Sequence, residues 1–137
     1  MPALELRPEA PDDPLMVLGR ESRLVQVLRN LIANAVSFAP PRSRIRLLAE
    51  GDGDTVTIAV EDDGPGIPEG KLEAIFDRFY TERPAGEKFG THSGLGLSIS
   101  KQIVEAHGGQ IGAENRVDAE GAVLGARFVV RLPRARE

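Results

Sequence analysis

The stretch Asp62-Asp63-Gly64-Pro65-Gly66-Ile67-Pro68 is the most informative part of the sequence, because further along the chain reads Gly94-Leu95-Gly96-Leu97. The first stretch is an acidic, glycine-rich turn, and the second is a glycine turn that opens a helix. Two asparagines, Asn30 and Asn34, precede both on an earlier helix. Each motif alone is weak, since Asp, Gly and Pro are ordinary turn residues. Their order along the chain predicts a nucleotide site.

The composition fits one globular domain over residues 1–137. Hydrophobic residues make up 41% of the chain and the formal charge is −4, so there is no overall attraction for nucleic acid. The chain has no cysteine and therefore no disulfide framework or thiolate metal site. No apolar run approaches the roughly 20 residues of a membrane span, and residues 1–5 lack the apolar core of a secretory signal. We expect a cytoplasmic location, either for a stand-alone domain or for a part of a longer protein.

Hydrophobic periodicity predicts an α+β fold. Apolar residues recur at helical spacing, or alternate as in strands. We expect helices over 21–38, 71–79 and 94–107, strands over 4–7, 44–49, 56–60, 110–115 and 123–132, an extended piece over 15–18 and a flexible loop over 81–93. In the last strand Leu124, Ala126, Phe128 and Val130 fall on one face. These elements predict a two-layer α/β sandwich, with one mixed, mainly antiparallel sheet and the helices on one face.

Asn30 and Asn34 are four residues apart, so they lie one turn apart on the same face of the first helix. Neutral amide oxygens suit a hard cation such as Mg²⁺, which keeps some waters and is shared with substrate phosphates. The alternative is a pair of solvated or locally capping asparagines. Ser37 falls near the same stripe of the helix.

Asp62 stands where a strand ends and the Gly64–Gly66 turn begins. A carboxylate there can accept a hydrogen bond from the exocyclic amine of a base, and the glycines allow a flat base to approach the backbone. Gly94 and Gly96 open a helix, whose free N–H groups form an anion site. The alternatives are a plain turn and a flexible helix entry. Arg78, Arg83 and Lys88 are candidates to neutralise phosphates, or are solvated charges of a loop.

Together these motifs resemble the catalytic and ATP-binding domain of bacterial sensor histidine kinases, in the superfamily shared with gyrase, heat-shock chaperones and MutL mismatch-repair proteins. Residues 23–35 match the N box, 62–66 the first glycine box, 76–80 the F box and 94–97 the second glycine box. The resemblance covers nearly the whole chain. It implies a Bergerat-type α/β sandwich with an ATP lid over about 77–93.

The resemblance implies roles for the matched residues. Asn34 would bind Mg²⁺ with support from Asn30, so these two would be the catalytic residues. Asp62 would hold the adenine amine, and Phe38 would lie against the adenine ring. The implied ATP-binding set is Asn30, Asn34, Phe38, Asp62, Gly64, Gly66, Ile67, Phe79, Tyr80, Arg83, Lys88, Ser93, Gly94, Leu95, Gly96 and Leu97. Many family members carry Lys or Arg where this chain has Ser37, so phosphate charge must be met by the cation, the helix end or a lid base.

Position 30 separates the branches of this superfamily. Members that hydrolyse ATP, and serine kinases that act on anti-sigma partners, usually have Glu there, whereas the amide of Asn30 cannot take a proton. The resemblance therefore implies a kinase domain that positions Mg²⁺–ATP for γ-phosphoryl transfer. The acceptor would be a His on a separate dimerisation domain, with a response regulator downstream, because neither His92 nor His107 has the setting of an acceptor. A serine kinase or anti-sigma regulator and a nucleotide-binding pseudokinase remain alternatives.

Overall fold

The computed structural model describes residues 3–8, 17, 19–51, 53–68, 70–77 and 96–134, with only the backbone described for residues 3–8. In chain order the elements are β1 (Ala3–Pro8), α1 (Glu21–Phe38), β2 (Arg44–Gly51), β3 (Thr55–Glu61), the 3₁₀ helix η1 (Ala74–Phe76), α2 (Gly96–Ala106), β4 (Gln110–Val117) and β5 (Val123–Pro133). Among these residues, neither α-helix combines the length and the apolar character that a membrane crossing requires.

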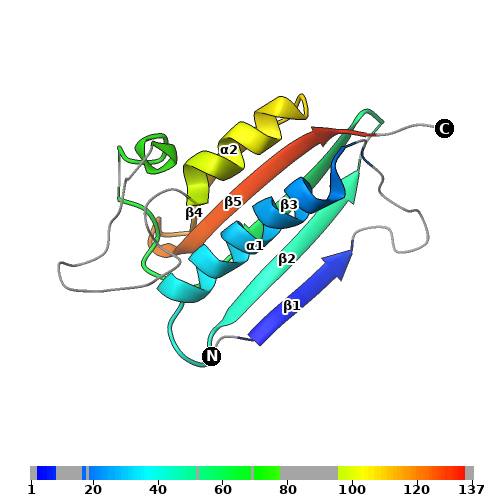
Figure 1. Cartoon of the computed structure of the whole chain (residues 1–137). Helices are drawn as coiled ribbons and strands as arrows, with labels where there is room; N and C mark the ends of the chain where they lie inside the picture. The colour runs from blue at the N-terminus through cyan, green and yellow to red at the C-terminus, as the bar shows by residue number, and fades with distance from the viewer. Residues whose placement is uncertain are drawn as a thin grey trace.

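The strands form one sheet in the order β1-β2-β3-β5-β4. β1 pairs with β2 in parallel, and the other neighbours are antiparallel. Both α-helices cover the same face of this sheet (Figure 1). The predicted two-layer α/β sandwich with a mixed, mainly antiparallel sheet is therefore confirmed.

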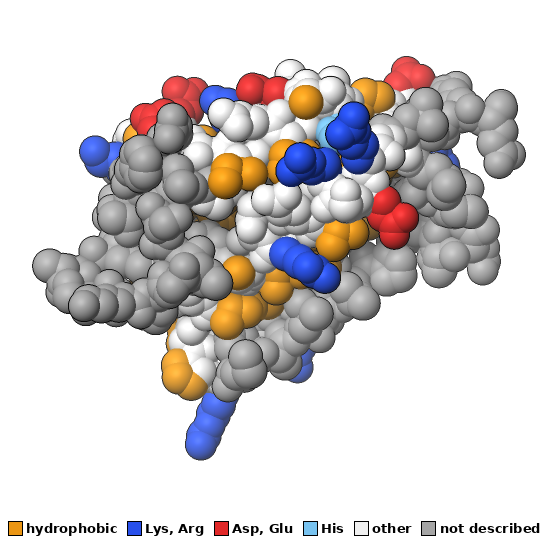
Figure 2. Space-filling model, in the orientation of Figure 1, with side chains coloured by type: hydrophobic (Ala, Val, Ile, Leu, Met, Phe, Trp, Pro, Cys, Tyr) orange, Lys and Arg blue, Asp and Glu red, His pale blue; other side chains and the backbone are white. Residues whose placement is uncertain are grey.

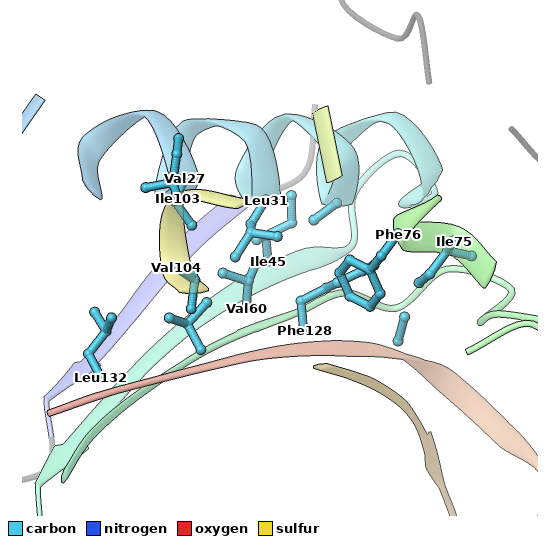
Figure 3. Close-up of a cluster of buried hydrophobic side chains, with 13 residues drawn as sticks. Val27, Leu31, Ile45, Val60, Ile75, Phe76, Ile103, Val104, Phe128 and Leu132 are labelled. Carbon is cyan, nitrogen blue, oxygen red and sulfur yellow. The ribbon is translucent and has the colours of Figure 1, made fainter. Parts of the chain in front are cut away.

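The core lies between the two helices and the sheet, because alternate residues of β2, β3, β4 and β5 point to the helix side. Its largest fully buried hydrophobic side chains come from both layers: Leu31, Ile45, Val60, Val104 and Val130. The first four are labelled in Figure 3. The ring of Phe76 meets that of Phe128 edge to face, with centroids 6.3 Å apart, a favoured arrangement for an aromatic pair. This contact attaches η1 to the sheet.

The outer surface of the helix layer is mixed in character. On the helix-bearing face the basic, acidic and apolar side chains of the described residues are intermixed (Figure 2).

Four large hydrophobic side chains in the described part of the chain are exposed, namely Val25, Val117, Val123 and Leu124. Three of them lie at the turn end of the β4–β5 hairpin.

The predicted helix over 21–38 has the bounds of α1, and the five predicted strands are present. The predicted helix over 71–79 is wrong in its described part, where only η1 is helical. Gly70 has a φ of +82°, and the following turn is closed by short-range hydrogen bonds from Phe76 to Glu73 and from Asp77 to Ala74. Burial of Ile75 and Phe76 in the core, not helical propagation, fixes this segment.

Leu124 shares its strand stripe with three buried residues, yet it is 45% exposed. The pairing of β4 with β5 shifts register between Arg116 and Val117, so the stripe leaves the core at that end. The predicted extended piece over 15–18, apart from Val17, and the predicted loop over 81–93 lie outside the described residues.

Candidate nucleotide-binding site

The acidic turn begins with a buried carboxylate. Asp62 follows β3 and is 2% exposed. Its Oδ1 accepts hydrogen bonds from the N–H of Gly64 at 2.8 Å and of Ala126 at 3.2 Å. Burial raises the pKa of the Asp62 carboxyl, against the opposing effect of these two N–H groups.

The two oxygens of Asp62 have different surroundings. Oδ1 is occupied by two backbone donors, whereas no described residue donates to Oδ2. Among the described residues, Oδ2 is not one of the fully buried polar atoms that lack a hydrogen-bond partner, so it can accept an N–H group that a ligand brings. The exocyclic amine of adenine is such a donor.

Gly64 and Gly66 are required for close packing within the protein. A Cβ at Gly64 would lie 2.8 Å from the carbonyl oxygen of Phe38, and a Cβ at Gly66 would lie 2.7 Å from Oδ1 of Asn115. Gly66 also has a φ of +81°, which side chains disfavour. The glycines therefore allow the turn to pack against the end of α1 and against β4. The sequence analysis explained them only by the approach of a base and did not predict these contacts within the protein.

Asn30 joins the two helices. Its Nδ2 donates to the carbonyl oxygen of Gly96 at 3.2 Å and to Oγ of Ser100 at 3.2 Å, and Ser100 is fully buried. The predicted N-box helix and the start of α2 are thus in direct contact. The amide of Asn30 acts here as a donor that fixes the beginning of α2.

Asn34 lies one helical turn after Asn30, and Phe38 one turn after Asn34, so the three residues lead from α2 toward the acidic turn. All three are partly buried. Ser37 Oγ donates to the backbone carbonyl of Asn34 at 3.0 Å, so this hydroxyl is used locally. The predicted residues on α1 therefore connect the two glycine motifs.

The remaining predicted residues divide into two groups. Ile67 and Leu97 are partly buried and pack against the core, so the structure gives them a packing role. Seven others lie outside the described residues: Phe79, Tyr80, Arg83, Lys88, Ser93, Gly94 and Leu95.

The sequence analysis missed the residues that support the acidic turn from β4. Asn115 hydrogen-bonds both backbone groups of Ile67, and Arg116 donates to the carbonyl oxygen of Asp62 at 2.7 Å. No local signal identifies them, because their role arises only when β4 passes beside a turn far away in the sequence.

The side of the turn away from the helices carries an ion-pair network. Asp63 Oδ1 accepts from Arg46 at 2.7 Å and from Arg116 at 2.6 Å, while buried Glu61 accepts from Arg46 and from Arg127 at 3.2 and 2.6 Å. Burial raises the pKa of Asp63, but the hydrogen bonds from Arg46, from the N–H of Arg44 and from Arg116 together leave it below its usual value.

The strand register brings these charges together. Arg46 pairs with Glu61, Glu61 with Arg127, and Arg127 with Glu114, so opposite charges alternate across four neighbouring strands. Opposite charges directly across a strand pair stabilise a sheet. The network therefore stabilises the part of the sheet from which the acidic turn emerges.

Comparison with known proteins identifies relatives with the same architecture. Sensor protein ChvG of Agrobacterium fabrum is 51% identical over 121 residues, which cover 88% of this chain and 20% of that protein. The solved structure of a mycobacterial sensor histidine kinase, MprB, has a TM-score of 0.81 at 28% identity and covers 98% of this chain and 83% of that one. Full-length ShkA in complex with AMPPNP gives a TM-score of 0.79 at 29% identity, over 98% of this chain and 26% of that chain.

The chain spans about a fifth of the length of the curated relatives it matches. The family described as "Histidine kinase-, DNA gyrase B-, and HSP90-like ATPase" matches residues 19–136, which include α1, the acidic turn and α2. The chain therefore belongs to this ATPase family, and this membership implies that it binds ATP.

Proposed function

We propose that this chain is the catalytic domain of a sensor histidine kinase. It positions Mg²⁺–ATP so that the γ-phosphoryl group passes to a His on a separate helical dimerisation domain, from which a response regulator receives it. The observation that carries the proposal is the buried carboxylate of Asp62, with one oxygen held by backbone N–H groups. It stands in a chain whose relatives are sensor histidine kinases.

Asp62 recognises adenine in this proposal. Its Oδ2 accepts the exocyclic amine, which guanine does not offer at the same position. Phe38 lies against the base, and the contact between Gly64 and the Phe38 carbonyl supports this, since it brings the acidic turn to the last turn of α1. Gly66 and Ile67 form the far end of the same turn.

Asn34 is the proposed protein ligand of Mg²⁺. Its amide oxygen is a hard donor, and Mg²⁺ in nucleotide sites is commonly held by one or two protein oxygens together with substrate phosphates and water. The donor set therefore fits a cation that arrives with ATP. When bound, the cation supplies neutralisation of phosphate charge.

Asn30 supports the phosphate side. By donating to Gly96 and Ser100 it orients the first turn of α2, where N–H groups are suited to bind phosphate oxygens. Because its amide cannot remove a proton from water, Asn30 favours transfer over hydrolysis. By resemblance, the proposal assigns Phe79, Tyr80, Arg83, Lys88, Ser93, Gly94, Leu95 and Leu97 to the remaining ATP contacts.

A phosphotransfer assay tests the proposal. We expect the isolated chain to bind Mg²⁺–ATP, yet neither to label itself nor to hydrolyse ATP appreciably, because position 30 carries Asn and not a Glu that could activate water, and because the proposed acceptor His belongs to another domain. Addition of the helical domain from the same kinase, with γ-labelled ATP, should produce an acid-labile label on its His. The same domain with that His replaced by Ala is the control.

Two results would contradict the kinase assignment. One is the absence of label on a folded acceptor domain while ATP is bound. The other is hydrolysis by the chain alone at about 1 s⁻¹, within the usual range of enzymes, that an Asn30→Ala variant loses. The second result would place the chain on the ATP-hydrolysing branch.

A further inference from the structure

One side chain of β4 holds the far end of the acidic turn. Asn115 Oδ1 accepts the N–H of Ile67 at 2.7 Å, and Asn115 Nδ2 donates to the carbonyl oxygen of Ile67 at 2.8 Å. The carboxamide thus satisfies both backbone groups of one residue, as a neighbouring strand would. Ile67 is not part of a strand, so this side chain extends the edge of the sheet by one pair of hydrogen bonds.

Gly66 permits this contact. Its φ is +81°, and a Cβ there would lie 2.7 Å from Asn115 Oδ1 and 2.6 Å from Cγ1 of Val123. Any side chain at Gly66 would therefore displace Asn115 from Ile67. The glycine and the asparagine form a matched pair, although they lie far apart in the sequence.

The near end of the turn is held by the next residue of the same strand. Arg116 Nη2 donates to the carbonyl oxygen of Asp62 at 2.7 Å and to Asp63 Oδ1 at 2.6 Å. Successive residues of a strand point to opposite faces, so Asn115 and Arg116 reach the turn from its two sides. Together they determine the distance between Asp62 and the Gly66–Ile67 backbone.

We propose that Asn115 is a positioning residue for adenine recognition. It fixes the backbone of Gly66 and Ile67 relative to Asp62, so that the purine is read by the carboxylate and the turn at once. This inference rests on the proposed function, because it assumes that the turn binds the base of ATP. Asn115 acts through Ile67, whereas Asn34 acts at the cation. The two asparagines should therefore affect different properties of nucleotide binding.

Two nearly isosteric variants test the role of the carboxamide. Asn115→Asp keeps an acceptor for the Ile67 N–H but replaces the donor to the Ile67 carbonyl with a carboxylate oxygen, and Asn115→Leu removes both hydrogen bonds. Gln110→Glu is the matched control, since it adds the same charge to an exposed position at the other end of β4.

Calorimetric titration with ATP and with GTP, each with and without Mg²⁺, is the main measurement. We expect both Asn115 variants to bind ATP about tenfold more weakly, the size of effect that follows from one or two misplaced hydrogen bonds. The preference for ATP over GTP should fall by a similar factor. The enhancement of ATP binding by Mg²⁺ should stay at the wild-type value, as should all properties of Gln110→Glu.

Amide hydrogen exchange in the nucleotide-free protein supplies an independent readout. In Asn115→Leu, the amides of Ile67 and Gly64 should exchange faster than in the wild type. Amides in the middle of β3 should keep their wild-type protection, which shows that the fold is intact.

The outcomes separate the inference from the function on which it rests. If the wild type binds no ATP, both are wrong. If the wild type prefers ATP and both variants keep the same ATP-to-GTP ratio, the inference is wrong and the function stands. A loss that affects ATP, GTP and Mg²⁺ enhancement equally, together with faster exchange throughout β3, would show a purely structural role and would also overturn the inference.

Discussion

Asp62 and Asp63 are adjacent in the chain but lie in two regions with opposite electrostatics. Asp62 is buried beside β5 and accepts backbone N–H groups, and its burial raises the pKa of its carboxyl. The side chain of Asp63 is 34% exposed and contacts two arginines, which hold its pKa below the usual value despite partial burial. The turn therefore separates a carboxylate suited to a ligand from one suited to the fold.

The difference shows that the residues around a binding site can stabilise the fold while the binding carboxylate itself destabilises it. A charged Asp62 lowers the stability of the nucleotide-free protein, because its charge is partly desolvated. The arginines that contact Asp63 and Glu61 stabilise the surrounding sheet. Proteins commonly keep such unfavourable groups at functional sites. The predictions below separate the two regions experimentally.

The largest expected effect is on ATP affinity. Asp62→Asn should weaken ATP binding roughly ten- to a hundredfold, since a hydrogen bond to a buried charged group contributes about 1.5–3 kcal/mol. Asp63→Asn makes the same chemical change one residue later and should bind ATP nearly as the wild type does. Calorimetric titration measures both, and equal ATP affinity of Asp62→Asn and the wild type would refute the adenine assignment.

The next effect is on stability. Glu61→Gln should lower the free energy of unfolding by about 2 kcal/mol, less than the loss of a fully buried ion pair because the guanidinium of Arg127 is partly exposed. Glu114→Gln is the control, since this glutamate is exposed and 3.9 Å from Arg127; it should cost less than about 0.5 kcal/mol. Urea denaturation of both variants measures the two free energies of unfolding. Similar losses of stability would mean that burial does not determine how much each glutamate contributes.

A smaller effect concerns the cation side of the site. Asn34→Ala should reduce the enhancement of ATP binding by Mg²⁺ about tenfold, a usual size for coupling between two ligands, while ATP binding without Mg²⁺ changes little. Titrations of both proteins with and without Mg²⁺ measure the coupling. Equal enhancement in both would mean that phosphates and water alone hold the metal.

The smallest effect is on the pH dependence of stability. With a raised pKa, the contribution of Asp62 is fully present below the ordinary aspartate value of 3.8 and is lost as pH rises through the higher folded value. With a lowered pKa, the contribution of Asp63 is present above 3.8 and is lost as pH falls through the lower folded value. Asp62→Asn should therefore gain relative stability with rising pH, and Asp63→Asn should lose it.

Urea denaturation over a series of pH values compares the two variants with the wild type. Slopes that change in the same direction for both would show that the two carboxylates do not differ as described. Each variant removes one negative charge, and the two positions are adjacent. Each variant therefore controls for the change in net charge in the other.

Local patterns were sufficient for the elements and for the position of the acidic turn. The 3.6-residue periodicity of 21–38 predicted α1 with its observed bounds, and alternation predicted the five strands. Local patterns failed in two places. The predicted helix around Ala74–Phe76 is a single 3₁₀ turn held by the core. Leu124 is exposed although it follows the alternation of β5.

The sequence by itself therefore determined the layers, the motifs and their order, because periodicity and turn chemistry act between near neighbours. Only the tertiary structure decided which residues support the site. The contact of Asn115 with Ile67 joins residues 48 apart, and that of Asn30 with Ser100 joins residues 70 apart. Such contacts depend on how β4 and α2 are placed beside the acidic turn and α1. The same placement puts Asp62 beside β5 and Asp63 beside the arginines, so only the folded chain gives these two neighbours different electrostatics.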